Sequence, residues 1–204
     1  MLAEAPAPDQ GPDRAPDRAL GRLSALVRRW NGTVNLVAPG TLAELEARHV
    51  ADSAQLWGLR PAGARTWADL GSGGGFPGLV VAALAGPEAA VALVESDARK
   101  CAFLRAAAQD MGLTVTILEA RAEALPPLGA DVVSARALAP LPRLLPLVAR
   151  HLREGGTAIL PKGRAWEAEV EEARRTWGFD LDARPSATDA DARVLLLTRL
   201  ARRP

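Results

Sequence analysis

Residues 66–78 of this chain read Thr-Trp-Ala-Asp-Leu-Gly-Ser-Gly-Gly-Gly-Phe-Pro-Gly, and the fold is best predicted from this segment. Its first five residues form a short, mostly apolar segment that is bounded by turn residues, which is typical of a buried parallel strand. The glycines that follow permit positive φ angles and let a ligand approach the backbone closely. Pro77 fits the first turn of a helix, which the apolar residues 79–84 continue. A strand, a glycine loop and a helix N-terminus in succession predict a site for a nucleotide-like ligand.

Strands and helices alternate after this stretch, which indicates a parallel α/β sheet. The apolar runs predict further parallel strands over residues 90–95, 114–119, 130–134 and 156–160. Helical patterns cover residues 97–111, 141–152 and 164–177. Residues 179–183 and 193–200 are expected to close the sheet as an antiparallel pair. The sequence therefore predicts a doubly wound, mostly parallel, seven-stranded sheet.

The residues before the sheet divide into a tail and a helical extension. Residues 1–16 contain four prolines and are predicted to be a disordered tail. Residues 17–62 are predicted to form N-terminal helices, and residues 63–204 to form the main domain. Apolar residues recur at helical spacing up to Trp30, and Asn31-Gly32 is expected to end that first helix.

A second helix is expected in the extension, running toward Trp57. Thr41 and Glu44 have the spacing of a capping box, which predicts its start. In the same segment, His49 is expected to be a hydrogen-bonded structural histidine, and Asn35 and Asp52 suit capping and bracing roles.

The composition is that of a soluble globular protein, with 49% hydrophobic and 24% charged residues. A net charge of +1 means that a nucleic-acid partner must be held by local basic patches. The single cysteine, Cys101, excludes an internal disulfide and a cysteine metal cluster, and two histidines are too few for a histidine-rich metal site. We therefore expect no metal. The chain shows neither a membrane-spanning apolar run nor a secretion signal, so we expect a cytoplasmic protein.

Two cofactors fit the glycine loop. Gly73-x-Gly75-x-x-Gly78 has the spacing of the dinucleotide fingerprint, with Glu95 about 20 residues beyond the loop. Asp69-x-Gly71-x-Gly73-x-Gly75 also resembles the signature of S-adenosylmethionine-dependent methyltransferases. Both cofactors carry a ribose diol that an acid after the second strand can bind, so Glu95 does not decide between them.

Three features favour S-adenosylmethionine. An acid at Asp69 fits the methyltransferase pattern, where it would lie near the cationic amino-acid end of the cofactor, directly or through water. A chain of 204 residues leaves little room for a separate catalytic domain after a dinucleotide domain. The chain also has no tyrosine for the Tyr-x-x-x-Lys machinery of single-domain reductases. We therefore expect a Rossmann-like class I S-adenosylmethionine-dependent methyltransferase fold.

With its flanking residues included, the sequence resembles the bacterial 16S ribosomal RNA guanine-N7 methyltransferases, also called glucose-inhibited division protein B. The Phe-Pro-Gly after the glycines and the Ser-x-Arg-Ala after the fourth strand are the specific matches. The matching pieces occur in family order over residues 30 to 163 and are Trp30-Asn31, Asn35-Leu36, Arg48-His49-x-x-Asp52-Ser53, the stretch from Asp69 to Gly78, Glu95-Ser96, Arg99-Lys100, Phe103-Leu104-Arg105, Arg121-Ala-Glu123, Ser134-Ala-Arg136-Ala137 and Leu160-Pro-Lys162-Gly163.

The resemblance implies S-adenosylmethionine as the cofactor, and 16S rRNA or the small ribosomal subunit as the partner. Gly71 and Phe76 would line the methionine side of the cofactor, and Ala122 and Glu123 would lie by the adenine. Arg136 would close the site at the end of the fourth strand. The expected cofactor-binding residues are Asp69, Gly71, Gly73, Gly75, Phe76, Glu95, Ala122, Glu123 and Arg136.

The chemistry implied by the resemblance agrees with the residues that follow the fourth strand. Guanine N7 carries a lone pair and no proton, so its methylation needs placement of donor and acceptor and no general base. The chain has Ser134-Ala-Arg136-Ala there, and not the Asn/Asp-Pro-Pro-aromatic segment of enzymes that methylate exocyclic amines. Arg136 is the expected catalytic residue and would hold the cofactor carboxylate or donate to guanine O6. The alternative is a surface arginine that contacts phosphate.

Basic side chains are the candidates for contacts with the RNA backbone. Lys162 lies on a Pro-Lys-Gly turn that suits a phosphate contact. The other candidates, which can equally form a solvated face, are Arg28, Arg29, Arg99, Lys100, Arg121 and Arg164. Two alternative functions stay open: the same fold acting on another RNA, a protein or a small molecule, and a non-catalytic RNA-binding assembly protein.

Overall fold

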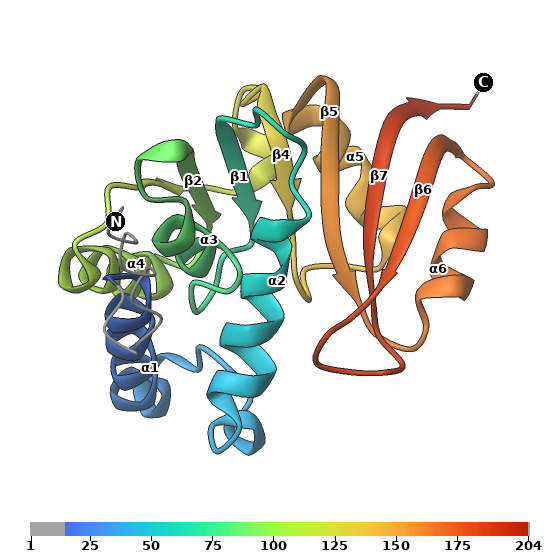
Figure 1. Ribbon diagram of the computed structural model, residues 1–204. Helices are drawn as coiled ribbons and strands as arrows, with labels where there is room; N and C mark the ends of the chain where they lie inside the picture. The colour runs from blue at the N-terminus through green and yellow to red at the C-terminus, as the bar shows by residue number, and fades with distance from the viewer. Residues whose placement is uncertain (1–14, 204) are drawn as a thin grey trace, which may run out of the picture.

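In the computed structural model, which describes residues 15–203, seven strands form one sheet in the order β3-β2-β1-β4-β5-β7-β6 (Figure 1). β7 runs antiparallel between β5 and β6, and the other pairings are parallel. The predicted doubly wound, mostly parallel sheet with an antiparallel closing pair is confirmed. The strands are β1 (Thr66–Leu70), β2 (Ala90–Glu95), β3 (Thr116–Glu119), β4 (Ala130–Ser134), β5 (Leu152–Lys162), β6 (Trp177–Pro185) and β7 (Arg193–Arg202).

Helices cover both faces of the sheet and create two hydrophobic cores. α1 (Ala15–Val34), α2 (Asp52–Gly58), α3 (Gly78–Ala85) and α4 (Ala98–Met111) pack on one face. α5 (Leu141–His151) and α6 (Trp166–Ala173) pack on the other. Because side chains alternate along a strand, Trp67 joins the first core and its neighbour Ala68 the second. The short helical turns are Pro39–Thr41, Glu46–Ala51, Gly86–Glu88 and Ala122–Ala124.

The connection between β3 and β4 differs from the others in the parallel part of the sheet. Helices α3, α4 and α5 join the other parallel strands, whereas β3 and β4 are joined by the single 3-10 turn Ala122–Ala124. The first residues of β1, β2 and β3, together with Leu118 and Leu128, line an apolar groove of about 560 Å³. The segment between β3 and β4 therefore has less regular structure to pack on the sheet than a segment with a helix would have.

The first helix is longer than predicted, because Asn31-Gly32 does not end it. α1 continues to Val34, and Asn35 then adopts a positive φ of 52°. The buried side chain of Asn31 accepts hydrogen bonds from the N–H groups of Leu36 and Val37 and donates to the carbonyl oxygen of Val37. Asn31 thus fixes the loop after the helix from within the last turn.

The predicted capping box at Thr41 and Glu44 is wrong. The Thr41 hydroxyl donates to the Ala38 carbonyl within a 3-10 turn, and Glu44 forms an ion pair with Arg48. The second helix instead begins as the π-helical turn Glu46–Ala51 and continues as α2. The remaining differences are at the ends of elements, where β5 is longer and α6 shorter than expected.

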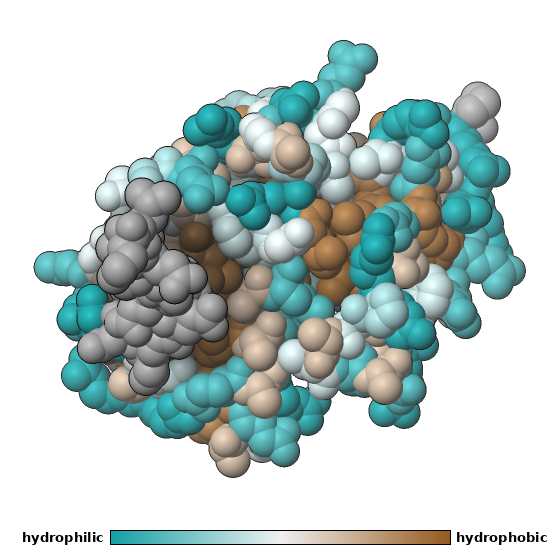
Figure 2. Space-filling model, in the orientation of Figure 1, coloured by the Kyte–Doolittle hydropathy of each residue, from teal (hydrophilic) through white to brown (hydrophobic). Residues whose placement is uncertain are grey.

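The N-terminal extension lies against α3 and α4, and on the face drawn in Figure 2 hydrophilic residues surround hydrophobic areas. The predicted disordered tail lies outside the described residues, apart from residues 15 and 16, which begin α1. Within residues 15–203, none of the helices has the length and apolar content needed to cross a membrane.

Candidate active site

Two neighbouring cavities open at the edge of the sheet where the parallel strands end, which is where doubly wound sheets bind ligands. The smaller cavity has a volume of about 350 Å³ and lies over the glycine loop and the end of β2. The larger, of about 720 Å³, lies between α2, the end of β5 and the loop that joins β6 to β7. Three consecutive residues, Arg136, Ala137 and Leu138, line both cavities. The loop after β4 is therefore their shared wall.

Asp69, on β1, fixes the end of the glycine loop through hydrogen bonds. Its side chain points to the α3 side of the sheet, where Oδ2 accepts the Gly78 N–H at 3.1 Å and Oδ1 accepts the Ser134 hydroxyl at 2.7 Å. The Ser134 oxygen in turn accepts the indole N–H of Trp67 at 2.8 Å. Asp69 is fully buried and lines neither cavity. Both of its oxygens accept hydrogen bonds from the protein, and its predicted place near the amino-acid end of the cofactor, directly or through water, stays a prediction.

Burial raises the pKa of the Asp69 carboxyl to about 6, although the hydrogen bonds from Ser134 and Gly78 lower it. The folded protein therefore binds this proton more tightly than the unfolded chain, whose carboxyl has an ordinary pKa. Between about pH 4 and pH 6 this site makes the free energy of unfolding fall as the pH rises.

Asp69→Asn is expected to remove that pH dependence, because the amide does not titrate. The free energy of unfolding of the wild type, minus that of the variant, should fall by on the order of 2 kcal/mol between pH 4.5 and pH 7. Urea unfolding of both proteins at the two pH values measures this difference. Parallel curves for the two proteins would contradict a raised pKa at Asp69.

Glu95 joins the end of β2 to the glycine loop. Its Oε2 accepts the Gly73 N–H at 2.9 Å, and its Oε1 accepts the N–H groups of Ser96 and Asp97 at 2.7 and 2.9 Å. A carboxylate has about four acceptor sites, so these three bonds leave Glu95 able to accept a ligand hydroxyl. Because Glu95 also lines the smaller cavity, it offers the acceptor that a ribose diol needs.

Six of the nine predicted cofactor-binding residues line the smaller cavity, and the other three do not. Gly75 is buried, and a Cβ there would lie 2.5 Å from Cδ1 of Leu79, so its glycine serves packing. Phe76 is buried and, like Asp69, lines neither cavity. The six that line the smaller cavity are Gly71, Gly73, Glu95, Ala122, Glu123 and Arg136.

Leu138 covers the first glycine of the loop. A Cβ on Gly71, whose φ is 70°, would lie 2.7 Å from Cδ1 of Leu138. Leu138 is also the large hydrophobic side chain that the fold leaves most open to solvent, at 42% exposure. Any side chain at position 71 would therefore push the shared wall outward.

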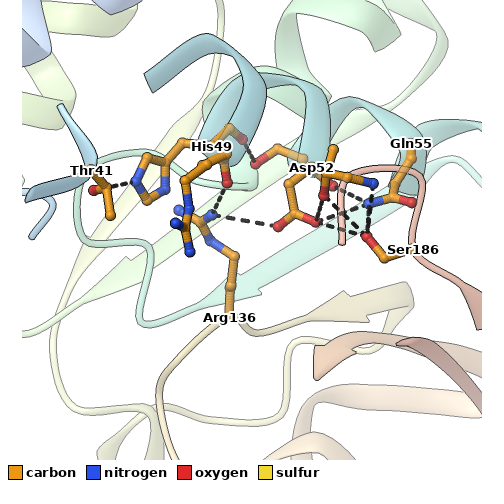
Figure 3. Close-up of polar contacts among 9 residues, drawn as sticks. Thr41, His49, Asp52, Gln55, Arg136 and Ser186 are labelled. Carbon is orange, nitrogen blue, oxygen red and sulfur yellow. Dashed lines mark hydrogen bonds and ion pairs between the residues drawn. The ribbon is translucent and has the colours of Figure 1, made fainter. Parts of the chain in front are cut away.

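Arg136 lies in the shared wall, and Figure 3 shows its guanidinium beside Asp52. Its Nη1 lies 3.5 Å from Oδ2 of Asp52 and donates to the carbonyl oxygen of Arg48 at 3.4 Å. The guanidinium also lies 5.3 Å from the centre of the Phe76 ring. Burial lowers the pKa of Arg136, and the charge of Asp52 opposes that shift. The side chains of Arg136 and Asp52 are only 18% and 17% exposed, so this is a largely desolvated cation beside its counterion.

Asp52 also connects Arg136 to the loop between β6 and β7. Its Oδ1 accepts the amide of Gln55 at 2.9 Å and the hydroxyl of Thr188 at 3.1 Å. Gln55 in turn accepts the backbone N–H of Ala187 at 2.9 Å. One carboxylate thus ties α2, the shared wall and the β6–β7 loop together (Figure 3).

His49 is held in a structural contact next to this network. The Thr41 hydroxyl donates to Ala38, so its oxygen accepts the Nε2–H of His49 at 2.8 Å. Burial, followed by the charge of Arg136, lowers the pKa of His49 to about 4. His49 is therefore neutral near pH 7.

Lys162 lines the larger cavity, and its role as a phosphate contact stays a prediction. Its side chain is 9% exposed, and Nζ lies 2.9 Å from Glu169 and donates to the Ala139 carbonyl at 2.8 Å. The same Glu169 oxygen accepts the N–H of Leu141 at 2.7 Å. Lys162 therefore braces the segment that follows the shared wall.

The other predicted RNA-binding residues divide by position. Lys100 and Arg121 line the smaller cavity. Arg28 is paired with Glu46, and Arg99 with Asp97. Four of the candidates line neither cavity, namely Arg28, Arg29, Arg99 and Arg164.

Two cations of the larger cavity, Arg48 and Arg193, were not among the predicted site residues. Arg193 begins β7, the antiparallel strand, so it lies at the same edge as the ends of the parallel strands. The predicted antiparallel pair already contained that signal. In the described part of the chain, no group of three or more His, Cys, Asp or Glu residues is placed to hold a metal ion.

Comparison with known proteins gives one family and one fold. The family model described as rRNA small subunit methyltransferase G matches residues 17–192. A protein of that name from Cereibacter sphaeroides is 49% identical over 188 residues, covering 89% of this chain and 90% of the relative. Another from Rhodospirillum centenum is 50% identical over 184 residues, covering 90% of this chain and 84% of the relative.

Solved structures share the fold at low sequence identity. A T. thermophilus 16S rRNA methyltransferase, in complex with AdoMet and guanosine, has a TM-score of 0.54 at 22% identity, covering 76% of this chain and 40% of that one. A predicted O-methyltransferase from Agrobacterium tumefaciens has a TM-score of 0.56 at 19% identity, covering 73% and 79%. The expected class I methyltransferase fold is confirmed.

Proposed function

Because the chain belongs to the rRNA small subunit methyltransferase G family, we propose that it transfers a methyl group from S-adenosylmethionine to N7 of a guanine in 16S ribosomal RNA. The observation that carries this proposal is the pair of cavities that share Arg136, Ala137 and Leu138. Direct group transfer requires donor and acceptor to be held next to each other, and two cavities with a common wall meet that requirement.

The smaller cavity fits a nucleoside cofactor by the chemistry of its lining. The free acceptor capacity of Glu95 suits a ribose diol, and the cavity floor at Gly71 and Gly73 presents backbone without side chains. Ala122 and Glu123 also line it, and the resemblance predicts that they lie by the adenine. When bound, S-adenosylmethionine supplies a methyl group on a positively charged sulfur.

The shared wall suits an acceptor that has no proton to lose. Among Arg136, Ala137 and Leu138 there is a cation but neither a carboxyl nor an imidazole. Burial, followed by the charge of Arg136, lowers the pKa of His49 beyond it to about 4, which makes its imidazole a weak base. Methylation of guanine N7 needs no general base, so positioning by this wall is sufficient. Arg136 has donors for the cofactor carboxylate on one side, or for guanine O6 on the other.

The larger cavity suits an RNA strand better than a small neutral molecule. Arg48, Arg136 and Arg193 line it, and arginine favours phosphate groups through its planar donors. Carboxylates line it too, and two of them, Glu44 and Asp52, pair with Arg48 and Arg136. Arg48 is well exposed, with 58% of its side chain open to solvent. We expect the methylation rate to fall as salt is raised, because phosphate contacts release counterions.

The proposal is tested by incubating the purified chain with labelled S-adenosylmethionine and small ribosomal subunits from cells that lack the enzyme. We expect about one methyl group per subunit, in 16S rRNA, at a single guanine that becomes sensitive to cleavage at N7-methylguanine. Subunits from cells that contain the enzyme should take up almost no label, because their site is already filled. Label in another RNA, in protein or at another atom would establish one of the alternatives, and no label in any fraction would contradict the proposal.

A further inference from the structure

The turn that borders the base end of the smaller cavity is held by the last residues of α5. Ala122 and Glu123 line that end, in the segment between β3 and β4 that has no α-helix of its own. The 3-10 turn Ala122–Ala124 is short, and its own backbone hydrogen bonds run from Ala124 to Arg121 and from Leu125 to Ala122. Contacts from another element add to these local bonds.

Arg150 and His151 supply those contacts. The Nε and Nη2 groups of Arg150 both donate to the carbonyl oxygen of Leu125, at 2.9 and 2.7 Å. The Nε2 of His151 lies 2.9 Å from the carbonyl oxygen of Ala122. Two consecutive side chains at the end of α5 thus hold both ends of the turn.

His151 is built for this single bond. It is fully buried, and because a carbonyl oxygen only accepts, Nε2 must carry the hydrogen. Its Nδ1 is buried and has no hydrogen-bond partner among the described residues, so a second proton there would be a buried, unpaired donor. Burial accordingly lowers the pKa of His151. The imidazole stays neutral and in one tautomer, with its donor aimed at Ala122.

We infer that His151 is a positioning residue for the cofactor, acting through the Ala122 carbonyl, and that Arg150 supports it through Leu125. This inference rests on the proposed function, because it takes the smaller cavity as the site of the cofactor. The pair anchors a turn that stands where the other parallel strands are joined by a helix. It fixes the base end of the cavity and leaves the shared wall at Arg136, where the transfer occurs, untouched.

The test measures S-adenosylhomocysteine binding by calorimetry, together with the KM for S-adenosylmethionine and kcat. His151→Met keeps a side chain of similar length without a donor and should weaken S-adenosylhomocysteine about 10-fold, as expected for one buried hydrogen bond. The KM for S-adenosylmethionine should rise by a similar factor, while kcat at saturating cofactor and the KM for ribosomal subunits stay within about twofold. His151→Gln, whose amide reaches the position of Nε2, should restore most of the affinity.

Two control variants separate positioning from general loss of stability. Val148→Ala removes buried packing from the same helix and should lower the melting temperature with little change in cofactor affinity. Arg150→Gln loses its contact with Leu125 from an exposed side chain and should weaken S-adenosylhomocysteine about threefold. Arg143→Gln, on the exposed face of the same helix, should change nothing.

Several outcomes overturn the inference. Wild-type affinity in His151→Met, equal weakening in Val148→Ala, or a loss of kcat at saturating cofactor would each show that His151 does not position the cofactor. If His151→Met does not fold, wild-type affinity in Arg150→Gln overturns it. Failure of the wild type itself to bind S-adenosylhomocysteine would instead refute the proposed function.

Discussion

Arg136→Ala is expected to lower kcat by about 100-fold, the effect of removing one preorganised donor from an active site. Arg136 is the charged residue of the wall between the two cavities, and its guanidinium is fixed by Asp52, the Arg48 carbonyl and the face of Phe76. Its donors therefore keep one orientation before any ligand binds. Single-turnover methylation of small subunits at saturating cofactor measures the chemical step directly.

The same variant distinguishes the two possible contacts of Arg136. If the guanidinium holds the cofactor carboxylate, the dissociation constant of S-adenosylhomocysteine should rise along with the loss of kcat. If it donates to guanine O6, that constant should stay near the wild-type value while kcat falls. Arg136→Lys keeps the charge but loses the planar fork and the Phe76 contact, so we expect an intermediate loss of about 10-fold.

A matched control exists elsewhere in the chain. Arg60 pairs with Glu88 at 3.1 Å and stacks on Trp57 at 3.5 Å, so it makes the same two kinds of contact as Arg136, but it lines neither cavity. Arg60→Ala should leave kcat and cofactor affinity unchanged. Near-normal kcat and affinity in Arg136→Ala would show that Arg136 takes no part in cofactor binding or methyl transfer.

The parts of the fold that the sequence predicts are those specified by neighbouring residues. The strand, glycine loop and helix of residues 66–78 follow from local periodicity and from where glycine and proline stand. The strand order could be expected because parallel strands joined by helices have few arrangements. The stop predicted at Asn31 failed because the choice between ending a helix and fixing the next loop depends on where the side chain points.

Side-chain partners that are far apart in the sequence could not be predicted. Periodicity shows that Asp69 lies on a buried strand, but its partner Ser134 comes from β4 and was expected only from a family motif. Lys162 had the sequence context of a phosphate contact. The sequence does not show that Glu169 and the carbonyl oxygen of Ala139 come within hydrogen-bond distance of its Nζ in the folded protein.

 The Lys162–Glu169 ion pair is therefore a product of tertiary packing. The β6–β7 loop gives no sequence signal that it will meet Asp52, because the two are 136 residues apart at Thr188.

Gly78→Ala is expected to reduce both the stability of the fold and the affinity for the cofactor. A Cβ at position 78 would lie 2.3 Å from Cδ2 of Leu93 and 2.7 Å from Oδ2 of Asp69, both of them fully buried. Gly78 begins α3 and donates its N–H to Asp69, so relief of the clash must move the helix or the carboxylate that fixes the glycine loop. Overpacking of this kind costs about 1–3 kcal/mol, and we expect the upper end because two partners must give way.

Urea unfolding and S-adenosylhomocysteine calorimetry on the same preparation measure the two effects of Gly78→Ala. We expect a loss of about 3 kcal/mol in the free energy of unfolding and a loss of at least 10-fold in affinity, because the loop moves with α3.

Gly21→Ala is the matched control, since a Cβ there meets nothing within 4 Å and its position inside α1 favours alanine. Adding Leu93→Ala to Gly78→Ala removes one of the two clashes, so the double variant should lose less stability than the sum of the single losses. Additive losses, or wild-type affinity in Gly78→Ala, would show that the start of α3 does not control the glycine loop.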